Sequence, residues 1–248
     1  MIVLKSSREI DRMRVACSIV AEILEGLRPL ICPGATTLDL DRYASAETLK
    51  RNAKCAFRGY NNFPGSLCCS PNEVVVHGFP NKTPLKSGDI LSLDFGVVYD
   101  EFFGDAAVTI PVGDVSAAAK KLISVTEASL YAGIDMAVPG NRLGDISSAV
   151  QKYVESRGYS VVRDFVGHGI GRNLHEDPQI PNYGLPGKGV KLKPGMVLAI
   201  EPMINEKSYE VRVLSDNWTV VTCDGGLSAH FEHTVAITEN GPEILTRI

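Results

Sequence analysis

The segment Leu85–Asp94 reads LKSGDILSLD, and a close variant of it, LKPGMVLAIE, returns at Leu192–Glu201. In both copies a Lys-x-Gly turn comes before an apolar strand, and the strand ends on a carboxylate. The two carboxylates, Asp94 and Glu201, are 107 residues apart (201 − 94). Because side chains alternate between the faces of a strand, the small residue two positions before each acid shares its face and leaves space beside it.

A second pair of matching segments supports an internal duplication. Asp105 begins DAAVTI and Glu232 begins EHTVAI, so another acid leads a strand in each half of the chain. Further upstream, the Pro-Gly turn at 33–34 returns at 139–140, in both cases ahead of an Asp. Three matches in the same chain order are difficult to attribute to chance. We therefore infer two similar halves that face each other across one central site.

The succession of segments predicts an α+β protein whose halves, about 1–113 and 114–248, merge into a single domain. Helices are expected over 6–28, 36–52, 116–136 and 143–157, and strands over 67–70, 74–76, 90–98 and 101–111. The stripe of the second helix that is expected to be buried consists of Leu38, Tyr43, Ala46 and Leu49. The aromatic, turn-rich segment 57–64 is expected to be a loop outside the core.

Composition and missing motifs exclude several classes of function. A net charge of −4 and a pI of about 5.8 give no electrostatic basis for nucleic-acid binding. The sequence has no run of about 18 apolar residues and no signal-peptide core, so neither a membrane span nor export is expected. The six cysteines form no CxxC pair, which favours a reducing cytoplasm. Nucleophilic-serine and nucleotide-binding motifs are absent as well.

Four carboxylates, Asp94, Asp105, Glu201 and Glu232, are expected to converge if the two halves face each other. Like charges gathered in one pocket raise one another's pKa values unless cations neutralise them. Two divalent ions would carry the four positive charges that balance the four acids. Ligation by oxygen favours hard or borderline metals, so Mn, Fe, Co and Zn are all candidates.

Among the histidines, His168 is the best candidate for a nitrogen ligand. It lies in the sequence GHGIG, where glycine on both sides leaves the ring accessible. His77 and His175 also lie at or near glycine, and each either lines a surface loop or stands beside a metal-bound substrate. His233 is expected on the opposite strand face from Glu232, in a structural position.

In this order, the motifs closely resemble those of type I methionine aminopeptidases over nearly the whole chain. The matching segments are NEVVVHG at 72–78, GDILSLD at 88–94, GD at 104–105, GHGIGRNLHE at 167–176, GMVLAIEP at 195–202 and FEHT at 231–234. The resemblance implies the pita-bread (creatinase/aminopeptidase) fold, in which pseudo-twofold related α+β halves share a central antiparallel sheet. It also implies an enzyme that removes the initiator methionine from peptides and nascent chains during translation. We expect a monomeric cytoplasmic protein that associates transiently with the ribosome.

The resemblance further implies a set of five metal ligands in this sequence. They are Asp94, Asp105, His168, Glu201 and Glu232. Asp105 and Glu232 would bridge two divalent ions, and Asp94 would hold one of them. His168 and Glu201 would hold the other.

The substrate side of the site also follows from the resemblance. His77 and His175 are expected to contact the substrate, and the residues expected to line a methionine pocket are Tyr60, Phe63, Cys68 and Trp218. Two positions depart from the family pattern. Leu174 stands where relatives often have Phe, and Phe57 stands where they often have a smaller residue, so the resemblance does not fix the shape of the pocket.

Such a dinuclear site leads to a hypothesis for the reaction. A water that bridges two cations ionises near neutral pH, and the resulting hydroxide attacks the first peptide carbonyl. Glu201 is expected to move the proton. His175 is expected to stabilise the oxyanion, with His77 near the scissile nitrogen. A small second substrate residue is expected, because a large one would collide with the mouth of the site.

Two other functions compete with this hypothesis. Xaa-Pro peptidases, such as prolidase and aminopeptidase P, share the fold but usually carry a separate N-terminal domain, for which this chain has no room. Pita-bread domains also serve as metal-free binding modules, for example in histone chaperones. Such modules have lost ligands, whereas all five ligand positions are filled here.

Overall fold

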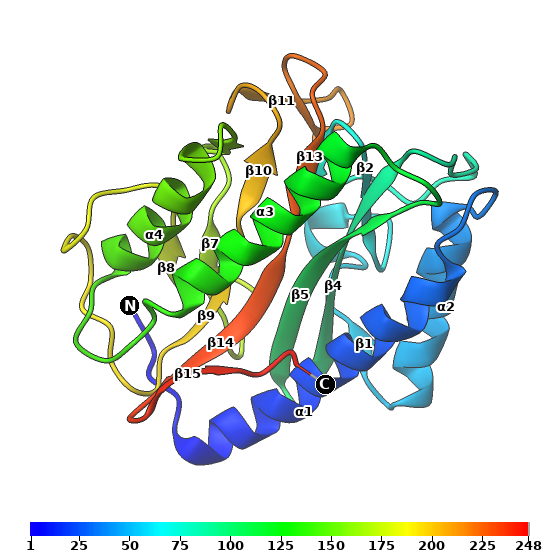
Figure 1. The fold of residues 1–248 in the computed structure, drawn as a ribbon. Coiled ribbons are helices and arrows are strands. Elements are labelled where there is room, and N and C mark those ends of the chain that lie inside the picture. Colours follow the sequence, from blue (N-terminus) through cyan, green and yellow to red (C-terminus); the bar gives the residue numbers. More distant parts are fainter. Residues whose placement is uncertain (248) are drawn as a thin grey trace.

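The computed structural model describes residues 1–247 and shows an α+β architecture with helices packed against a long antiparallel sheet (Figure 1). The helices are α1 (Ser7–Leu27), η1 (Arg28–Leu30), α2 (Thr37–Lys50), η2 (Tyr60–Asn62), α3 (Ala117–Ile134) and α4 (Leu143–Glu155). The strands are β1 (Lys54–Cys55), β2 (Cys68–Pro71), β3 (Val74–Val76), β4 (Ile90–Tyr99), β5 (Phe102–Pro111), β6 (Ser160–Val161), β7 (Gly167–Gly169), β8 (Glu176–Ile180), β9 (Val197–Ile200), β10 (Met203–Asn205), β11 (Val211–Val213), β12 (Val220–Thr222), β13 (Ser228–His230), β14 (Glu232–Thr238) and β15 (Gly241–Ile244).

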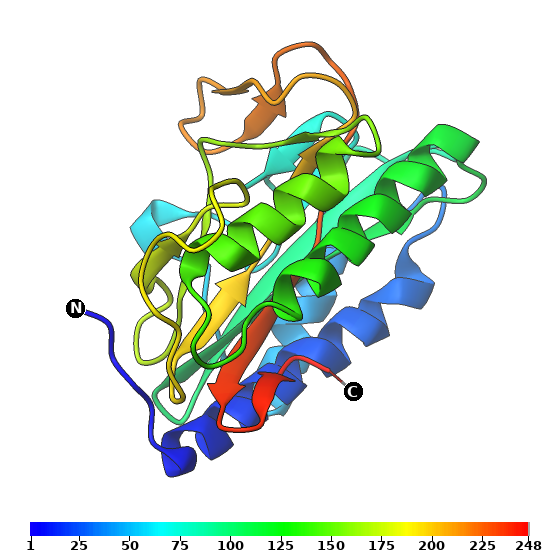
Figure 2. The same ribbon diagram turned by 60° about the vertical axis from the view of Figure 1, so that its left-hand side comes forward.

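Strands from both halves of the chain join in one sheet of nine. Its order is β1-β4-β5-β14-β9-β7-β8, with β2 added to β4 and β15 added to β14. Two three-stranded sheets, β13-β10-β6 and β11-β12-β3, complete the strand structure. In both views α1, α3 and α4 lie on the same side of the large sheet (Figures 1 and 2). No helix within residues 1–247 is both long and apolar enough to cross a membrane.

The first helix forms and packs as its sequence predicts. Ser6 caps its N-terminus, because the Ser6 hydroxyl accepts from the Glu9 amide while the Glu9 carboxylate accepts from the Ser6 amide. The apolar stripe of this helix, formed by Ile10, Met13, Cys17, Val20, Leu24 and Leu27, is buried. This stripe lies on β4 and β5, and the approach is close because Gly104 in β5 has no side chain to hold the helix away.

The predicted buried stripe of the second helix is wrong. Leu49 is 70% exposed and Ala46 is also exposed, while Leu38 and Tyr43 are half-buried. The buried face is instead made of Thr37, Leu40, Asp41, Ala44 and Thr48. Polar residues can occupy this face because they form hydrogen bonds there. A pattern of apolar residues does not reveal such bonds.

Asp41 provides the clearest example of such a partner. Its Oδ1 accepts hydrogen bonds from the backbone amides of Ser66 at 2.6 Å and Leu67 at 3.0 Å. Arg58 lies 3.2 Å from its other oxygen. The carboxylate thereby holds the segment before β2 against α2.

The segment 57–64 is irregular, as predicted, apart from the short helix η2, but the expectation that it lies outside the core is wrong. Phe57 and Phe63 are buried, at 8% and 3% exposure. Both belong to an apolar cluster that includes Phe102 and Leu174. The sequence alone did not show that this loop folds inward, because its packing partners lie far away along the chain.

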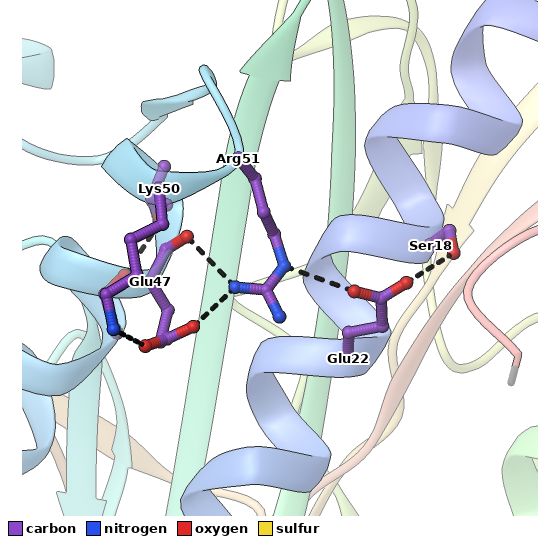
Figure 3. A network of polar contacts seen from close by, with 7 residues as sticks. Ser18, Glu22, Glu47, Lys50 and Arg51 are labelled. Carbon is purple, nitrogen blue, oxygen red and sulfur yellow. Dashed lines mark hydrogen bonds and ion pairs between the residues drawn. The ribbon is translucent and has the colours of Figure 1, made fainter.

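A surface network of charges ties α1 to α2 (Figure 3). Arg51, just after α2, lies 3.1 Å from the Glu22 carboxylate on α1 and 2.6 Å from the Glu47 carboxylate. Lys50 lies 2.6 Å from the other Glu47 oxygen, and the Ser18 hydroxyl donates to Glu22. Exposed ion pairs contribute little to stability, so this network supports an arrangement that apolar packing already fixes.

The internal repeat predicted from the sequence is present in the structure. Gly34 and Gly140 both have positive φ, at 94° and 96°. In the first half the Leu85 amide donates to the carbonyl oxygen of Ala35 at 2.8 Å. In the second half the Leu192 amide donates to the carbonyl oxygen of Asn141, also at 2.8 Å. Each Pro-Gly turn therefore packs beside the entry to its own acid-bearing strand in the same way.

The close contact between α1 and β5 leads to a first prediction. A methyl group at Gly104 would lie 2.7 Å from the Cys17 amide nitrogen and 2.8 Å from the Ala16 carbonyl carbon. Both atoms are backbone, so only a shift of the whole helix would relieve the clash. We expect Gly104→Ala to lower the free energy of unfolding by about 1–3 kcal/mol in denaturant titrations.

Gly184→Ala is the matched control for that substitution. Its added methyl would meet only the Ser147 side chain, with the nearest atom at 3.3 Å. A smaller loss than at Gly104 is expected. Equal losses in the two variants would show that helix–strand proximity is not the cause.

Candidate metal centre

The register of the large sheet aligns two of the predicted acids. Ala107 in β5 lies opposite Asp94 in β4 on one side and opposite Glu232 in β14 on the other. Residues directly opposite one another in antiparallel strands share a face, so all three point the same way. Asp105, two positions before Ala107, is on that face too.

A second row across the sheet adds the remaining ligand candidates. His168 in β7 lies opposite Ala199 in β9, and Ala199 lies opposite Thr234 in β14. Thr234 is two positions after Glu232, and Glu201 is two positions after Ala199, so the alternation places them all on the same face. Alanine side chains at the centres of both rows leave the space into which the longer side chains extend.

The acid-bearing face is the one opposite α1, α3 and α4 (Figures 1 and 2). His233, next to Glu232, points to the other face, where its Nδ1 lies 2.9 Å from the Thr246 hydroxyl and its ring lies beside Tyr131 of α3. The predicted structural position of His233 is confirmed.

All eleven predicted site residues line one cavity of about 290 Å³. The five ligand candidates in its wall are Asp94, Asp105, His168, Glu201 and Glu232. The six predicted substrate-side residues in its wall are Tyr60, Phe63, Cys68, His77, His175 and Trp218. Residues from both halves of the chain therefore converge, although their roles do not follow from position alone.

Four of the five ligand candidates belong to groups whose atoms are close enough to share an ion, and Asp94 belongs to neither group. One ligand atom each from Asp105, His168 and Glu232 lie within 4.8 Å of one another. Atoms from Glu201, His230 and Glu232 form a second such group. Glu232 belongs to both groups, as a residue placed between two ions would.

Unpartnered atoms show that the site fits a metal. Within residues 1–247, Oδ1 of Asp94, Oδ1 of Asp105 and Oε1 of Glu232 are buried and accept no hydrogen bond. Buried polar atoms without partners are costly and rare in folded proteins. Divalent cations would satisfy these oxygens and neutralise the carboxylates at the same time.

Burial and mutual repulsion perturb the acids strongly. Burial raises the pKa of Asp94 to about 7 and the pKa of Glu201 to about 8. The pKa values of Asp105 and Glu232 are raised well above their ordinary range, first by burial and then by neighbouring carboxylates. The cluster therefore retains protons at neutral pH unless cations replace them.

His168 is prepared to act as a nitrogen ligand. Burial lowers its pKa to about 4, so the ring is neutral at physiological pH. Its Nδ1–H donates to the carbonyl oxygen of Gly169 at 2.9 Å, which leaves the lone pair on Nε2. That Nε2 lies 3.6 Å from Oε1 of Glu201.

His77 is held in the cavity wall by an unusual backbone. Its φ is +62°, in the left-handed region that residues other than glycine rarely adopt. Gly78 must follow it, because a Cβ there would lie 2.1 Å from the Cys69 carbonyl oxygen. The His77 ring lies edge-on to Trp218 and Phe165, each 5.7 Å away. The surface-loop alternative for His77 is therefore wrong.

His175 lines the cavity from an exposed position between β7 and β8. Its Nδ1 lies 2.7 Å from the Tyr60 hydroxyl, and its ring centroid lies 4.4 Å from that of His168. Burial lowers its pKa. His175 is therefore a surface-loop residue that also lines the cavity.

The rest of the wall is largely apolar. Phe63 packs edge-on against Trp218 at 5.1 Å and against Phe79 at 5.4 Å. Leu174 and Phe57, the two positions that depart from the family pattern, are both buried in this wall and help to define its shape.

Sequence reasoning missed several residues at the site. Phe165, Val166 and Met203 line the cavity, and His230 lies beside Glu201. Phe165, Val166 and Met203 are apolar and belong to no motif that indicates chemistry. His230, however, stands two positions before Glu232, and that spacing on a strand signals a shared face.

A cluster of carboxylates and imidazoles in the wall of a cavity, with buried oxygens that lack partners, is typical of a metal-binding protein. The sequence model of metallopeptidase family M24 matches residues 11–239, and the chain belongs to this family. It is accordingly a hydrolase that uses divalent metal.

Relatives narrow the comparison further. The methionine aminopeptidase of Clostridium perfringens is 56% identical over 248 residues, which is 100% of both chains. The crystal structure of methionine aminopeptidase from Thermotoga maritima superposes with a TM-score of 0.98 at 51% identity and covers 100% of both chains. A prolidase from Pyrococcus furiosus shares the fold alone, with a TM-score of 0.81 and 23% identity over 99% of this chain and 66% of the prolidase. These similarities confirm the expected pita-bread fold.

The raised carboxyl pKa values predict an unusual pH dependence for the metal-free protein. Asp94 and Glu201 titrate near pH 7 and 8 when folded but near 3.8 and 4.5 in the unfolded chain. Raised folded pKa values contribute stability at low pH that is lost as pH rises. We expect the melting temperature in EDTA to fall between pH 6.5 and 8.5, with up to about 1.4 kcal/mol lost per pH unit while one carboxyl titrates.

The pH interval and two controls isolate this effect. Below pH 6.5 the buried histidines act in the opposite direction, because their lowered pKa values favour folding at higher pH. Glu201→Gln should flatten the decline, and added Mn²⁺ should remove it. A metal-free melting temperature that rises across the interval contradicts the prediction.

Proposed function

We propose that the protein is a methionine aminopeptidase that removes the N-terminal methionine from peptides and nascent chains. The observation that carries this proposal is the shared cavity, in which a cluster of ligand candidates adjoins an apolar wall that contains a thiol. Full-length similarity to methionine aminopeptidases supports it. The size of the cavity, about 290 Å³, suits one substrate side chain rather than an extended peptide.

Two divalent ions are proposed to occupy the centre. Asp105 and Glu232 would hold both ions, Asp94 would hold one, and His168 and Glu201 would hold the other. Support comes from charge balance, since four carboxylates match two dications, and from the position of Glu232 in both clusters of ligand atoms. Mn, Fe, Co and Zn all suit this donor set. When bound, such ions supply Lewis-acid activation of water and of the scissile carbonyl.

Glu201 is proposed to carry the proton during hydrolysis. Its carboxylate lines the cavity among the other ligand candidates, where it can take a proton from water and return it to the leaving amine. The other protein groups act by position. His175, held by Tyr60, would donate to the developing oxyanion, and His77 would face the scissile nitrogen.

The apolar wall is proposed to select methionine. Phe63 and Trp218 offer ring edges and faces, and Cys68 adds a polarisable sulfur, which suits a thioether side chain. Burial first, and then the charge of Asp94, raise the pKa of the Cys68 thiol well above its usual value, so it stays neutral. A substrate with a small second residue is proposed to be preferred. The side chains of Tyr60 and His175, which are in contact, occupy space beside the ligand cluster that a larger second residue would need.

We also propose that this hydrolysis takes place in the cytoplasm, on N-termini that emerge from the ribosome, with transient ribosome contact and a monomeric enzyme. The six cysteines are free thiols, which suits a reducing compartment.

Peptide specificity tests the proposed function. After chelation and return of a single metal, we expect methionine release from Met-Ala-Ser, slower release from Met-Arg-Ser and none of the alanine from Ala-Pro-Ser. Mass spectrometry of the products measures all three. Preference for Ala-Pro-Ser would indicate an Xaa-Pro peptidase. Metal-loaded protein that cleaves none of the peptides would indicate a binding module, and cleavage indifferent to EDTA would exclude metal catalysis.

The proposed proton carrier leads to a separate prediction. Glu201→Gln keeps the size of the side chain, so circular dichroism should remain that of the wild type. Turnover of Met-Ala-Ser should fall by roughly 10²–10⁴-fold, the usual contribution of general acid–base catalysis. Glu210→Gln, the same chemical change on the surface, is the control. Near-normal turnover in Glu201→Gln would remove Glu201 from the mechanism.

A further inference from the structure

His230 stands at the edge of the proposed metal centre on a firmly held backbone. It ends β13 and is 1% exposed. Its amide donates to the Thr109 hydroxyl at 2.9 Å, and the same hydroxyl lies 2.8 Å from the His230 carbonyl oxygen. The Ser92 hydroxyl lies 2.8 Å from the Thr109 hydroxyl. Neighbouring strands therefore fix the main chain from which the imidazole projects.

The Glu201 carboxylate lies between two imidazoles, with one oxygen facing each. Its Oε1 lies 3.6 Å from Nε2 of His168, and its Oε2 lies 3.3 Å from Nε2 of His230. A separation near 3.6 Å suits two ligands on one ion, because metal–ligand bonds of about 2.1 Å place neighbouring ligand atoms about 3.0–3.4 Å apart. If His168 and Glu201 hold the same ion, Oε1 is the ligating oxygen and Oε2 remains available to accept a hydrogen bond.

The Nε2 atom of His230 has no hydrogen-bond partner in the part of the chain that the structure describes, although it is fully buried. A buried ring nitrogen aimed at a carboxylate oxygen 3.3 Å away needs only a small rotation to form a good hydrogen bond. Ligating carboxylates are commonly held in this way by a further donor.

We propose that His230 is a positioning residue, whose Nε2–H donates to Oε2 of Glu201 and fixes that carboxylate while Oε1 ligates the ion. The inference rests on the proposed function, because it assigns Glu201 to a metal. Each carboxylate oxygen has two lone pairs, so Oε2 can accept from His230 and still take a proton from water. His230 would then orient both the ligand and the proton carrier.

Two substitutions separate hydrogen bonding from packing. His230→Gln keeps a donor N–H at about the reach of Nε2, and His230→Leu fills similar space with no donor. His233→Leu is the matched control, because His233 is a largely buried histidine three residues away on the opposite face. Circular dichroism checks the fold of each variant.

The primary measurement is calorimetric titration of Co²⁺ into metal-free protein. We expect His230→Leu to weaken Co²⁺ binding by about 10–100-fold, as is usual when the partner of a metal ligand is lost. His230→Gln should recover most of that affinity, and His233→Leu should bind Co²⁺ as the wild type does. The visible absorption of bound Co²⁺ should be the same in His230→Gln as in the wild type, because the ligands are unchanged.

Kinetics give an independent readout. We expect His230→Leu to lower kcat on Met-Ala-Ser more than it raises KM, with rescue by His230→Gln. Wild-type affinity in His230→Leu would overturn the inference. So would a His230→Gln variant as weak as His230→Leu, or one with an altered Co²⁺ spectrum, since both results would make His230 a direct ligand.

The wild-type titration separates the inference from the proposed function. Wild-type protein that binds no Co²⁺, or that releases no methionine when loaded, contradicts the proposed function whatever the variants do. Normal wild-type behaviour together with an unaffected His230→Leu contradicts the role of His230 alone.

Discussion

Four carboxylates gathered on one face of a sheet, two of them buried and two half-buried, impose the constraint on which the rest of this structure depends. Charges of one sign repel strongly where water is excluded, and unpaired oxygens there cost further free energy. Burial raises the pKa values of Asp94 and Glu201 in this environment. Divalent cations relieve repulsion and unpaired oxygens together, so metal binding and the energetics of the fold are coupled.

The antiparallel sheet makes such crowding possible. Its register brings Asp94 and Glu232 to opposite sides of one small residue, Ala107. In the second half, His168 likewise lies opposite a small residue, Ala199. Helices α1, α3 and α4 all pack on the other face, so the acid-bearing side stays open for a cavity (Figures 1 and 2). Backbone hydrogen bonds, rather than the side chains themselves, thus determine which acids meet.

Within that cavity, the proposed metal centre and the apolar wall lie side by side. Glu201 lies between His168 and His230, which separates the oxygen proposed for the metal from the oxygen proposed for the proton. Aromatic side chains and the Cys68 thiol enclose the neighbouring space. A metal centre that adjoins a largely apolar pocket is consistent with the proposed removal of a single N-terminal residue.

The sequence by itself determined the local elements and the two acid-bearing repeats, because strand alternation and turn residues are encoded within a few positions. Asp94 and Glu201 were identifiable from that pattern alone. Tertiary structure decided what depends on distant partners. Leu49 is exposed although it fits the apolar periodicity of its helix, and Phe63 is buried although its segment is irregular. The residues that cover Phe63, and those that could have covered Leu49, come from distant parts of the chain. The role proposed for His230 likewise depends on its contact with Glu201. That contact forms because the ends of β13 and β9 lie close together, which no local sequence pattern specifies.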